Sequence, residues 1–356
     1  MVLLGEAIED WTGDARFYEY STAADPEGSG AISRVPVRQF PPTVHAGGPT
    51  RTVLLDLADH LGVDGPATSP GLLASFMVIR PGDQLVTRPD ATSELYYCLR
   101  GSGHSAFEWS PAEGEVTTGT MPWGAGDFLT LPAGCTTLHR ADGADGADGA
   151  DGADGADGAD GADGADGAGK SRGSDGRSSA LLYRVTDAPL LRYLGVTPSR
   201  PRFRPTRFDG AEARERLAEV EHDPAAADRS RVSVLLGNTA TPQTLTVTHT
   251  LWAMLGILPV GRVQRPHRHQ SVALDLITAC APGCYSLVGS ELDGSGNIVD
   301  PIRVDWEPEG AFVTPPGMWH SHHNESGHPA YLVPIQDAGL HTYLRSLDIR
   351  FVHRDP

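Results

Sequence analysis

Two series of short apolar runs, each ended by turn residues, constrain the fold of this chain more than any other feature. Short runs rich in Val, Ile, Leu, Tyr and Phe, bounded by Gly, Pro or Asn, are typical of β-strands. One series begins at Leu72 and the other near Val232, and 356 residues exceed what one hydrophobic core usually supports. The sequence therefore predicts an all-β protein with two domains. The runs are LLASFMVI, ELYYCL, SAFEW, GDFLTLPAG and LLYRV in the first series, and VSVLLG, TLTVTHTLWAMLGILP, SVALDLITA, CYSLVG, IRVDW, GAFVTPPG and AYLVPIQ in the second.

The segments outside these two series complete the division of the chain. Residues 1–70 are interrupted by Pro and Gly, and we expect an irregular arm, with a short helix in LLDLADHLG, that packs across one domain or a neighbouring subunit. Residues 71–200 contain the first domain and residues 232–356 the second. Between them, residues 201–231 are expected to be a linker with a basic, Pro-rich start and a helix in AEARERLAEVEHD.

A low-complexity tract interrupts the first domain. Residues 141–167 are nine copies of Ala-Asp-Gly. Such a segment has few side chains to bury against the entropy of ordering, so we expect a disordered surface insertion over residues 141–178. Its nine aspartates account for half of the formal net charge of −18. The remaining acidic balance argues against nucleic acid or an anionic membrane as a partner, because both require clustered Lys and Arg, and favours a small-molecule partner.

Hydropathy and cysteine content indicate the compartment. The chain has no run of about 18 apolar residues, and its N-terminus lacks the regions of a signal peptide, so we expect a cytoplasmic protein without a membrane span. Four cysteines, Cys98, Cys135, Cys280 and Cys284, are too few for a disulfide framework. The last two lie in CAPGC, but no second pair follows to complete a zinc site, and we expect structural thiols.

The histidines of the second domain carry the strongest chemical signal. His267 and His269 are two residues apart, which on a strand directs both imidazoles to one face. Later in the chain His320 follows a Pro-Gly turn, from which a neighbouring strand can deliver it to the same interior. Three neutral imidazoles on one side of a divalent metal leave coordination positions open. The alternative is a chance grouping of histidines, and His322 and His323 are compatible with acid–base residues or with exposed loop residues.

The two histidine segments resemble the paired motifs of the cupin superfamily, in which a Gly-led HxH segment is followed by PxGxxHxxxN. Cupins usually add a glutamate ligand shortly after HxH, whereas Ala273 and Leu274 stand there, so a three-histidine site is implied. The resemblance implies a bicupin, with two tandem double-stranded β-helix (jelly-roll) barrels and a few short helices. The second motif is complete as Pro315, Gly317, His320 and Asn324.

The first domain keeps the spacing of these motifs without their ligands. The chain reads TRPDAT where HxH falls in the motif, the position of the third histidine is Thr137, and His139 comes two residues late. We therefore expect a degenerate metal site and a structural or dimerisation role for this domain. The retained skeleton consists of Gly82, Glu94, Gly101, Gly126, Pro132 and Gly134.

The HRH segment, PPGMWHSHHNESGHPAYLV and TDAPLLRYLG together resemble the gentisate, salicylate and 1-hydroxy-2-naphthoate dioxygenases over most of residues 70–350. The resemblance implies Fe(II) held by His267, His269 and His320, with a chelating aromatic hydroxy-acid and O2 bound beside it for ring cleavage. It further implies Gln270 and His322 as catalytic hydrogen-bonding residues and Trp319 as a packing residue. It also implies a homo-oligomer, either a dimer or a tetramer.

Two departures from this family bear on the substrate. The family usually keeps its iron in the first domain, whereas here only the second domain has all three histidines. In the family an arginine after the HxH segment is placed to meet a substrate carboxylate, and Asp275 stands at that position. An aspartate there repels a carboxylate unless Arg262, Arg265 or Arg268 compensates.

Three functions are compatible with such a site. The first is an iron(II) dioxygenase that cleaves an aromatic hydroxy-acid or similar chelating substrate, because ferrous iron with open positions binds substrate and O2 side by side. The second is a non-oxidative cupin, such as an isomerase or lyase, that uses the metal as a Lewis acid. The third is a non-catalytic protein that binds a metal or small ligand. Open coordination positions favour an enzyme, and the family resemblance favours the dioxygenase with Fe(II) as its cofactor.

Overall fold

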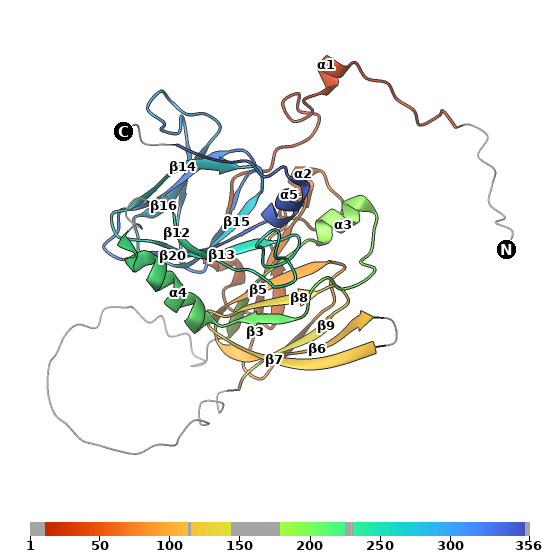
Figure 1. The fold of residues 1–356 in the computed structure, drawn as a ribbon, viewed down its shortest axis with the longest axis vertical. Coiled ribbons are helices and arrows are strands. Elements are labelled where there is room, and N and C mark those ends of the chain that lie inside the picture. The colour runs from red at the N-terminus through yellow and green to blue at the C-terminus, as the bar shows by residue number, and fades with distance from the viewer. Residues whose placement is uncertain (1–10, 113–114, 144–178, 225–228, 230, 353–356) are drawn as a thin grey trace.

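The computed structural model describes residues 11–112, 115–143, 179–224, 229 and 231–352 (Figure 1). Strands dominate these residues and form four sheets, two in each of two domains, in which every strand pair is antiparallel. The predicted all-β fold with two domains is therefore confirmed. The predicted disordered insertion at residues 141–178 lies, from residue 144 onwards, outside the described residues.

The first domain consists of a six-stranded sheet that faces a four-stranded sheet. The strand orders are β11-β8-β5-β10-β3-β2 and β4-β9-β6-β7. From β3 to β10 the chain alternates between the two sheets except at the β6–β7 hairpin, which is the connectivity of a jelly roll. The strands are β2 (Arg51–Leu54), β3 (Leu73–Ile79), β4 (Gln84–Thr87), β5 (Ser93–Arg100), β6 (Ser102–Ala112), β7 (Glu115–Gly124), β8 (Phe128–Pro132), β9 (Thr136–Ala141), β10 (Ala180–Thr186) and β11 (Thr206–Phe208).

The second domain repeats this order strand for strand. Its sheets are β1-β18-β15-β20-β13-β12 and β17-β16-β19-β14-β21, the last strand being an addition at the C-terminus. Within the described residues the sheets of each domain remain separate, so each predicted barrel is a pair of facing sheets. The strands are β1 (Arg38–Phe40), β12 (Val232–Leu235), β13 (Trp252–Leu258), β14 (Val263–His269), β15 (Ala273–Ala279), β16 (Cys284–Gly289), β17 (Ile302–Asp305), β18 (Ala311–Thr314), β19 (Trp319–Asn324), β20 (Ala330–Gln336) and β21 (Ile349–Phe351).

The N-terminal arm connects the two domains. Its strand β1 pairs with β18 of the second domain, and the next strand, β2, pairs with β3 of the first. The edge of the first domain that corresponds to β1 is occupied by β11, which comes from the predicted linker and pairs with β8. Residues 11–35 extend away from both domains (Figure 1). The arm and the linker therefore each add an edge strand to a domain.

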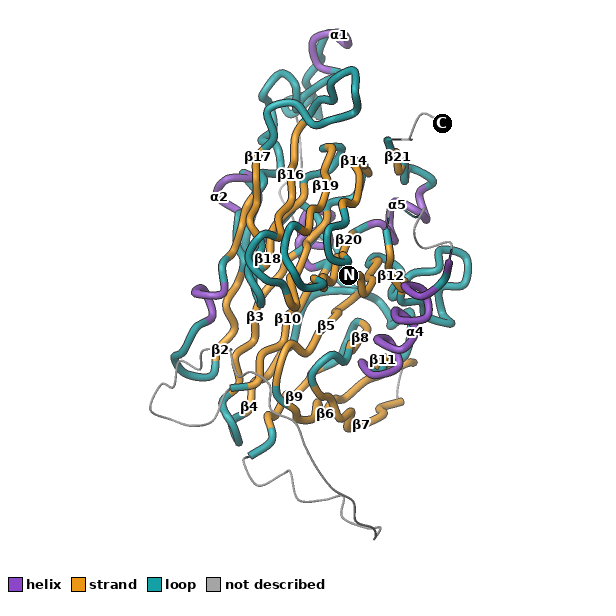
Figure 2. The backbone as a smooth tube through the Cα atoms, turned by 90° about the vertical axis from the view of Figure 1, so that its left-hand side faces the viewer, coloured by secondary structure: helices purple, strands orange, loops and turns teal. Residues whose placement is uncertain are grey.

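Helices are short and lie around the sheets (Figure 2). The predicted linker helix is present as α4, and Asp209 caps its first turn by accepting hydrogen bonds from the backbone of Ala211 and Glu212. Among the described residues no helix is long and apolar enough to cross a bilayer. The helices are α1 (Tyr20–Ala23), the 3-10 helix η1 (Pro42–His45), α2 (Ala58–Leu61), α3 (Ala188–Leu194), α4 (Gly210–His222) and α5 (Ala338–Leu344).

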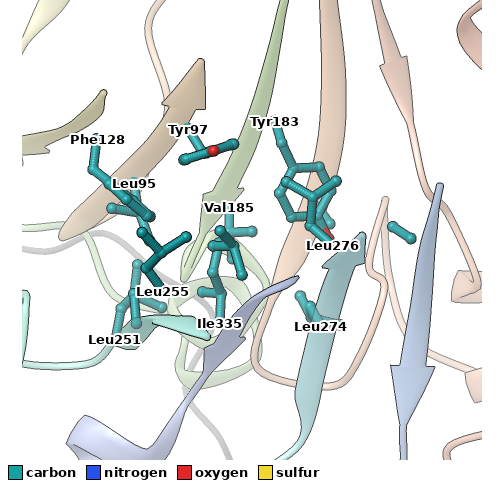
Figure 3. Packing of buried hydrophobic residues seen from close by; sticks show 14 of the residues in the cluster. Leu95, Tyr97, Phe128, Tyr183, Val185, Leu251, Leu255, Leu274, Leu276 and Ile335 are labelled. Carbon is teal, nitrogen blue, oxygen red and sulfur yellow. The ribbon is translucent and has the colours of Figure 1, made fainter. Parts of the chain in front are cut away.

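The largest hydrophobic core lies between the two domains (Figure 3). It forms where the outer faces of the two six-stranded sheets meet. Along β5, Leu95 and Tyr97 point into this shared core, whereas Tyr96 points into the interior of the first domain. Leu274 and Leu276 of β15 contribute from the second domain in the same alternating way. Strands that are buried on both faces explain why these runs are almost continuously apolar.

One predicted strand is shorter than expected. The apolar run at residues 244–259 forms a strand only from Trp252 onwards, as β13. The threonines before it bind loops instead: Oγ1 of Thr248 accepts from the backbone of Leu251, and Oγ1 of Thr250 donates to Ser93 of the first domain. Side-chain hydroxyls that bind nearby backbone compete with strand pairing. The four cysteines are all free thiols.

Candidate metal centre

Strands β14 and β19 place three histidines side by side in the second domain. His267 and His269 alternate with Arg268 along β14, so both face the interior, where each is 3 % exposed. His320 lies on β19, directly opposite His267 in the antiparallel register. One ring nitrogen of each histidine lies within 4.8 Å of those of the other two. The structure thus brings together the three residues predicted as metal ligands.

Hydrogen bonds to backbone carbonyls fix one tautomer in all three rings. Each Nδ1 lies 2.8–3.1 Å from a carbonyl oxygen two residues away, of Arg265, Ser271 and Met318 in turn. Because a carbonyl only accepts, Nδ1 carries the proton and Nε2 keeps its lone pair. Metal-binding histidines are commonly oriented in this way. Nε2 of His269 is buried and has no hydrogen-bond partner within the described structure, so this atom fits a metal ligand.

Burial keeps the three imidazoles neutral. It lowers the pKa of His269 to about 4 and the pKa values of His267 and His320 well below the ordinary value. The positive charge of Arg231 lowers the pKa of His267 further. A histidine binds metal in its neutral form, so the site is competent at neutral pH. Three imidazole nitrogens fit several divalent first-row metals, Fe(II) and Zn(II) among them.

A cavity of about 260 Å³, lined by His267 and His269 of the three histidines, opens between the facing sheets of the second domain. Its apolar walls include Trp252, Met254, Ile349 and Phe351. The ring of Phe351, on the added strand β21, stacks on His267 with centroids 5.8 Å apart and planes 13° from parallel. Pockets for drug-sized ligands range from about 300 to 1,000 Å³, so this cavity fits a smaller molecule.

Among the described residues that line the cavity, only Arg231 has an ionisable side chain that is normally charged at neutral pH. The terminal amide group of Gln264 lies beside both this guanidinium and the histidines: one of its two end atoms is 2.9 and 3.2 Å from Nε and Nη2 of Arg231 and 3.2 Å from Nε2 of His267. Nη1 of Arg231 lies 2.9 Å from Sδ of Met254. No carboxylate of the described residues lies within 4.0 Å of it. Burial lowers the pKa of Arg231, as expected where a charge leaves water without an ion-pair partner. Arg231 was not predicted as a site residue because it lies at the end of the linker, outside any motif.

His322 lies beside the three histidines and is 1 % exposed. Its ring centroid is 5.8 Å from that of His320 and 6.0 Å from that of His267. Nδ1 lies 2.7 Å from Oγ of Ser286, whereas Nε2 is buried without a hydrogen-bond partner in the described part of the chain. The predicted catalytic role of His322 is therefore compatible with its position.

The other predicted residues lie farther from the cavity. Gln270, predicted to be catalytic, is half-buried just after β14 and is not a lining residue, whereas Gln264 and Gln336 are. Trp319 packs beneath Arg268, whose guanidinium carbon is 5.1 Å from the ring centroid. His323 points to the opposite face of β19 from His322 and is half-buried.

Asp275 does not line the cavity. It is 2 % exposed, accepts a hydrogen bond from Oγ1 of Thr314 at 2.8 Å, and is not a lining residue. Burial raises its pKa to about 6, while the hydrogen bond from Thr314 acts in the opposite direction. The arginines expected to compensate for Asp275 also stay outside the lining, and the arginine in the cavity is Arg231. The three that stay outside are Arg262, Arg265 and Arg268.

The interior of the first domain holds an ion pair. Glu94 is 1 % exposed, and its Oε2 lies 2.7 Å from Nη2 of Arg184. Burial raises the pKa of Glu94, and the charge of Arg184 opposes this shift. His139 is fully buried and makes hydrogen bonds through both ring nitrogens, to Thr87 and Ser105. Within the described residues no cluster of metal-binding side chains forms here, and the only such cluster found is that of the second domain.

Comparison with solved structures identifies the fold. A variant of salicylate 1,2-dioxygenase from Pseudoaminobacter salicylatoxidans, crystallised with gentisate, matches with a TM-score of 0.57 at 14 % identity, over 87 % of this chain and 80 % of that chain. A further structure of salicylate 1,2-dioxygenase from the same organism matches with a TM-score of 0.56 at 15 % identity, over 86 % and 82 % of the two chains. No protein-family model and no curated protein matches the sequence. The chain therefore shares its fold with salicylate 1,2-dioxygenase, as the resemblance of its motifs predicted.

Proposed function

We propose that the second domain binds one divalent metal ion through Nε2 of His267, His269 and His320. The arrangement of the three rings carries this proposal, because each Nδ1 is committed to a carbonyl, which leaves Nε2 as the ligand atom, and one nitrogen of each ring lies within 4.8 Å of those of the other two in a buried site. Catalytic metal sites typically keep a coordination position open, whereas structural sites close it with a fourth protein ligand. Three ligands beside a cavity therefore support an enzyme rather than a structural site.

The cavity supports a small aromatic anion as the substrate. The planar fork of an arginine matches the two oxygens of a carboxylate, and Arg231 has no carboxylate partner among the described residues. Trp252, Met254 and Phe351 offer apolar and aromatic walls that suit a flat ring. Three neutral ligands also leave the 2+ charge of a metal uncompensated, which favours a substrate that chelates through anionic oxygens.

The reaction that fits these features best is ring cleavage of an aromatic hydroxy-acid, or a similar chelating substrate, by O2. Iron(II), bound at the three histidines, supplies one centre at which substrate and O2 meet and at which the spin barrier to O2 is removed. In this proposal Arg231 orients the carboxylate, Phe351 packs against the ring of the substrate, and His322 donates a hydrogen bond to a ligand oxygen. The likeness to salicylate 1,2-dioxygenase, crystallised with gentisate, supports this choice of substrate class.

Metal content and oxygen uptake test the proposal together. Protein purified without oxygen and loaded with Fe(II) is expected to hold about one iron per chain, and to consume O2 when given a salicylate, gentisate, a hydroxynaphthoate or a catechol. Replacement of Fe(II) by Zn(II) should abolish oxygen uptake, because zinc has no redox chemistry.

Two outcomes would redirect the proposal. Turnover of a substrate by the Zn(II) protein in the absence of O2 would establish a Lewis-acid enzyme in place of a dioxygenase. Tight metal binding without turnover of any substrate, with either metal, would establish a binding protein. Both outcomes leave the metal site intact and reject only the oxygenase assignment.

A further inference from the structure

A chain of hydrogen bonds ends at His322. Nε1 of Trp306 donates to Oγ of Ser286 at 2.8 Å, and this oxygen lies 2.7 Å from Nδ1 of His322. Ser286 on β16 is directly opposite His322 on β19, and the three residues are at most 5 % exposed. His322 follows His320 by two residues and faces the same interior. Its Nε2 is buried beside the three predicted ligands and has no partner among the described residues.

The first domain contains the same three residue types in the same arrangement. Nε1 of Trp123 donates to Oγ of Ser105 at 3.0 Å, and this oxygen lies 2.8 Å from Nδ1 of His139. Ser105 on β6 is directly opposite His139 on β9, and these strands correspond to β16 and β19. Nε2 of His139 has a partner, Oγ1 of Thr87 at 3.0 Å. The first domain therefore serves as an internal reference for the second.

In the first domain the two ends of the chain of hydrogen bonds fix the direction of every donor. An indole N–H only donates and a carboxylate only accepts. From Thr87 the chain continues through the hydroxyl of Tyr96, at 3.1 Å, to Oε2 of Glu94, at 2.6 Å, which is paired with Arg184. Every donor in this chain of hydrogen bonds has an acceptor when each side chain, from Trp123 to Glu94, accepts from the preceding one and donates to the next. In this arrangement the serine donates to Nδ1, and His139 carries its proton on Nε2.

We propose that Trp306 and Ser286 are positioning residues that hold His322 with its proton on Nε2, so that His322 donates a hydrogen bond to an oxygen of the ligand at the metal centre. The indole N–H occupies a lone pair of the serine, and Nδ1 of His322 is then the only acceptor for the hydroxyl proton among the described partners of Ser286. The opposite tautomer would leave that buried proton without an acceptor, which costs free energy. The tautomer of His322 does not depend on the proposed function, whereas its hydrogen bond to a ligand oxygen does.

None of the described residues offers His322 an acceptor equivalent to Glu94. In the first domain Glu94 is paired with Leu131, the residue before Pro132, and the equivalent residue of the second domain, paired with Thr314 before Pro315, is Ala273. By the same register, the equivalent of Arg184 is Pro334. The second domain therefore lacks, within the described residues, both members of the ion pair that ends the chain of hydrogen bonds in the first. A ligand oxygen would take the place of the carboxylate, beside the rings of His267 and His320.

Histidine tautomers can be read directly from long-range proton–nitrogen correlation spectra of metal-free protein labelled with nitrogen-15 histidine. His322→Gln and His139→Gln identify the two rings by loss of their signals. We expect a protonated Nε2 and an unprotonated Nδ1 for both rings. Ser286→Ala should remove this preference at His322 alone, Ser286→Thr should retain it, and Ser105→Ala should affect His139 alone. A protonated Nδ1 at His322 in the unsubstituted protein would overturn the proposal.

Salicylate binding to the Zn(II)-loaded protein, measured by calorimetry, tests the purpose of the tautomer without turnover. Ser286→Ala is expected to weaken binding roughly tenfold, because a hydrogen bond to a charged group is lost, and Ser286→Thr should restore it. Ser105→Ala, the matched change in the first domain, should leave the affinity unaltered. Unchanged affinity in Ser286→Ala, together with an altered tautomer, would overturn the role of the hydrogen bond. Absence of salicylate binding by the unsubstituted protein would instead reject the proposed ligand class, and the spectra would still decide the positioning role.

Discussion

The two domains use an arginine in opposite ways: Arg184 is buried, and Arg231 is half-buried. Arg184 in the first domain is paired with Glu94 inside that domain. Arg231 in the second domain faces a cavity and makes no ion pair among the described residues. Removing one partner of a buried ion pair costs stability because the other charge is left unpaired. Arg231 would instead gain an ion-pair partner when an anionic ligand binds. In the proposed function, this contrast distinguishes a first domain with a structural interior from a second domain that binds a ligand.

Arg231→Met tests the role of this charge. The substitution keeps an apolar side chain of similar length but removes the guanidinium, so salicylate binding to the Zn(II)-loaded protein should weaken by about 10- to 100-fold. Arg231→Lys should fall between, because lysine keeps the charge but not the planar fork. The control is Arg268→Met, an arginine that stacks on Trp319 outside the cavity. Equal losses in Arg231→Met and Arg268→Met would show that the cavity charge does not select the ligand.

His139 predicts a specific loss of stability in acid. Burial lowers its pKa to about 3, whereas an unfolded histidine titrates near 6.5. Above pH 6.5 the imidazole of His139 is neutral in both the folded and the unfolded chain. Below pH 6.5 it binds a proton in the unfolded chain but not in the folded chain. The free energy of unfolding therefore decreases as the pH is lowered to about 3. Metal-free protein should therefore lose, from this group alone, about 2 kcal/mol of unfolding free energy between pH 7 and pH 5. Denaturant unfolding of His139→Gln should show a loss smaller by this amount, and identical pH profiles would contradict the assignment.

At the residue scale the sequence predicted what a local pattern can carry. The spacing of His267 and His269 on a strand, and of His320 after a Pro-Gly turn, was sufficient to predict that these three histidines lie together. Arg231 was not predicted because no spacing links it to the histidines; only the closure of β12 against β13 brings it to them. The serine and tryptophan beside His322 are likewise joined by cross-strand register. Their signal in the sequence was present as the repeated Ser, Trp and His of the two domains, which only a comparison of the domains reveals.

At the scale of elements, the edges of the sheets were the least predictable part. Strands β1 and β11 are three residues each, too short to show an alternating pattern, and both come from segments predicted as arm or linker. They find equivalent edges because β18 and β8 are equivalent strands of the two domains. The long central strands were predicted from their apolar runs, since burial on both faces leaves few polar residues in them.

The segment before β1 exposes aromatic side chains that a solitary chain would be expected to bury. Phe17 is 97 % exposed, and Trp11, Tyr18 and Tyr20 are each at least 78 % exposed. Large aromatic residues gathered on an extended arm are typical of a contact with another molecule. We propose that residues 11–35 pack against a second copy of the chain, which makes the protein a homo-oligomer.

Light scattering after size-exclusion chromatography tests this arm. The full chain is expected to be a dimer or tetramer, and removal of residues 1–35 should shift it towards the monomer because strand β1 and both domains are retained. Replacing Phe17 and Tyr20 by Ser keeps the length of the arm and should give the same shift. A full chain that is monomeric at all concentrations, or a truncated chain with the same mass as the oligomer, would exclude the arm as the contact.

At the scale of the whole molecule the domains are not independent units. Their six-stranded sheets share the largest core, and side chains such as Thr250 and Ser93 form hydrogen bonds across the boundary. The first domain thus has a physical role even without metal ligands, because it covers the apolar outer face of the sheet behind the metal centre. This sharing was not visible in the sequence, where each apolar run was assigned to the interior of its own domain.

Leu276→Ala tests the shared core. Leu276 is fully buried in it, so the substitution should cost about 2–5 kcal/mol of unfolding free energy. Because both domains lose this packing, calorimetry should show one transition at a lower temperature. Leu182→Ala, inside the first domain, is the comparison for a core that is not shared. Two resolved transitions, of which Leu276→Ala moves only one, would contradict the single cooperative unit.

The most direct test of the account is the metal stoichiometry of three proteins prepared in parallel with Fe(II) in the absence of O2. The unsubstituted chain should retain about one equivalent of metal after removal of excess ion. His320→Ala should keep its fold but retain almost no metal, because only two of the three imidazole ligands remain. Thr137→Val alters the equivalent position of the first domain and should retain the full equivalent. Metal bound equally by all three proteins, or by none, would contradict the assignment of His267, His269 and His320 as the metal centre.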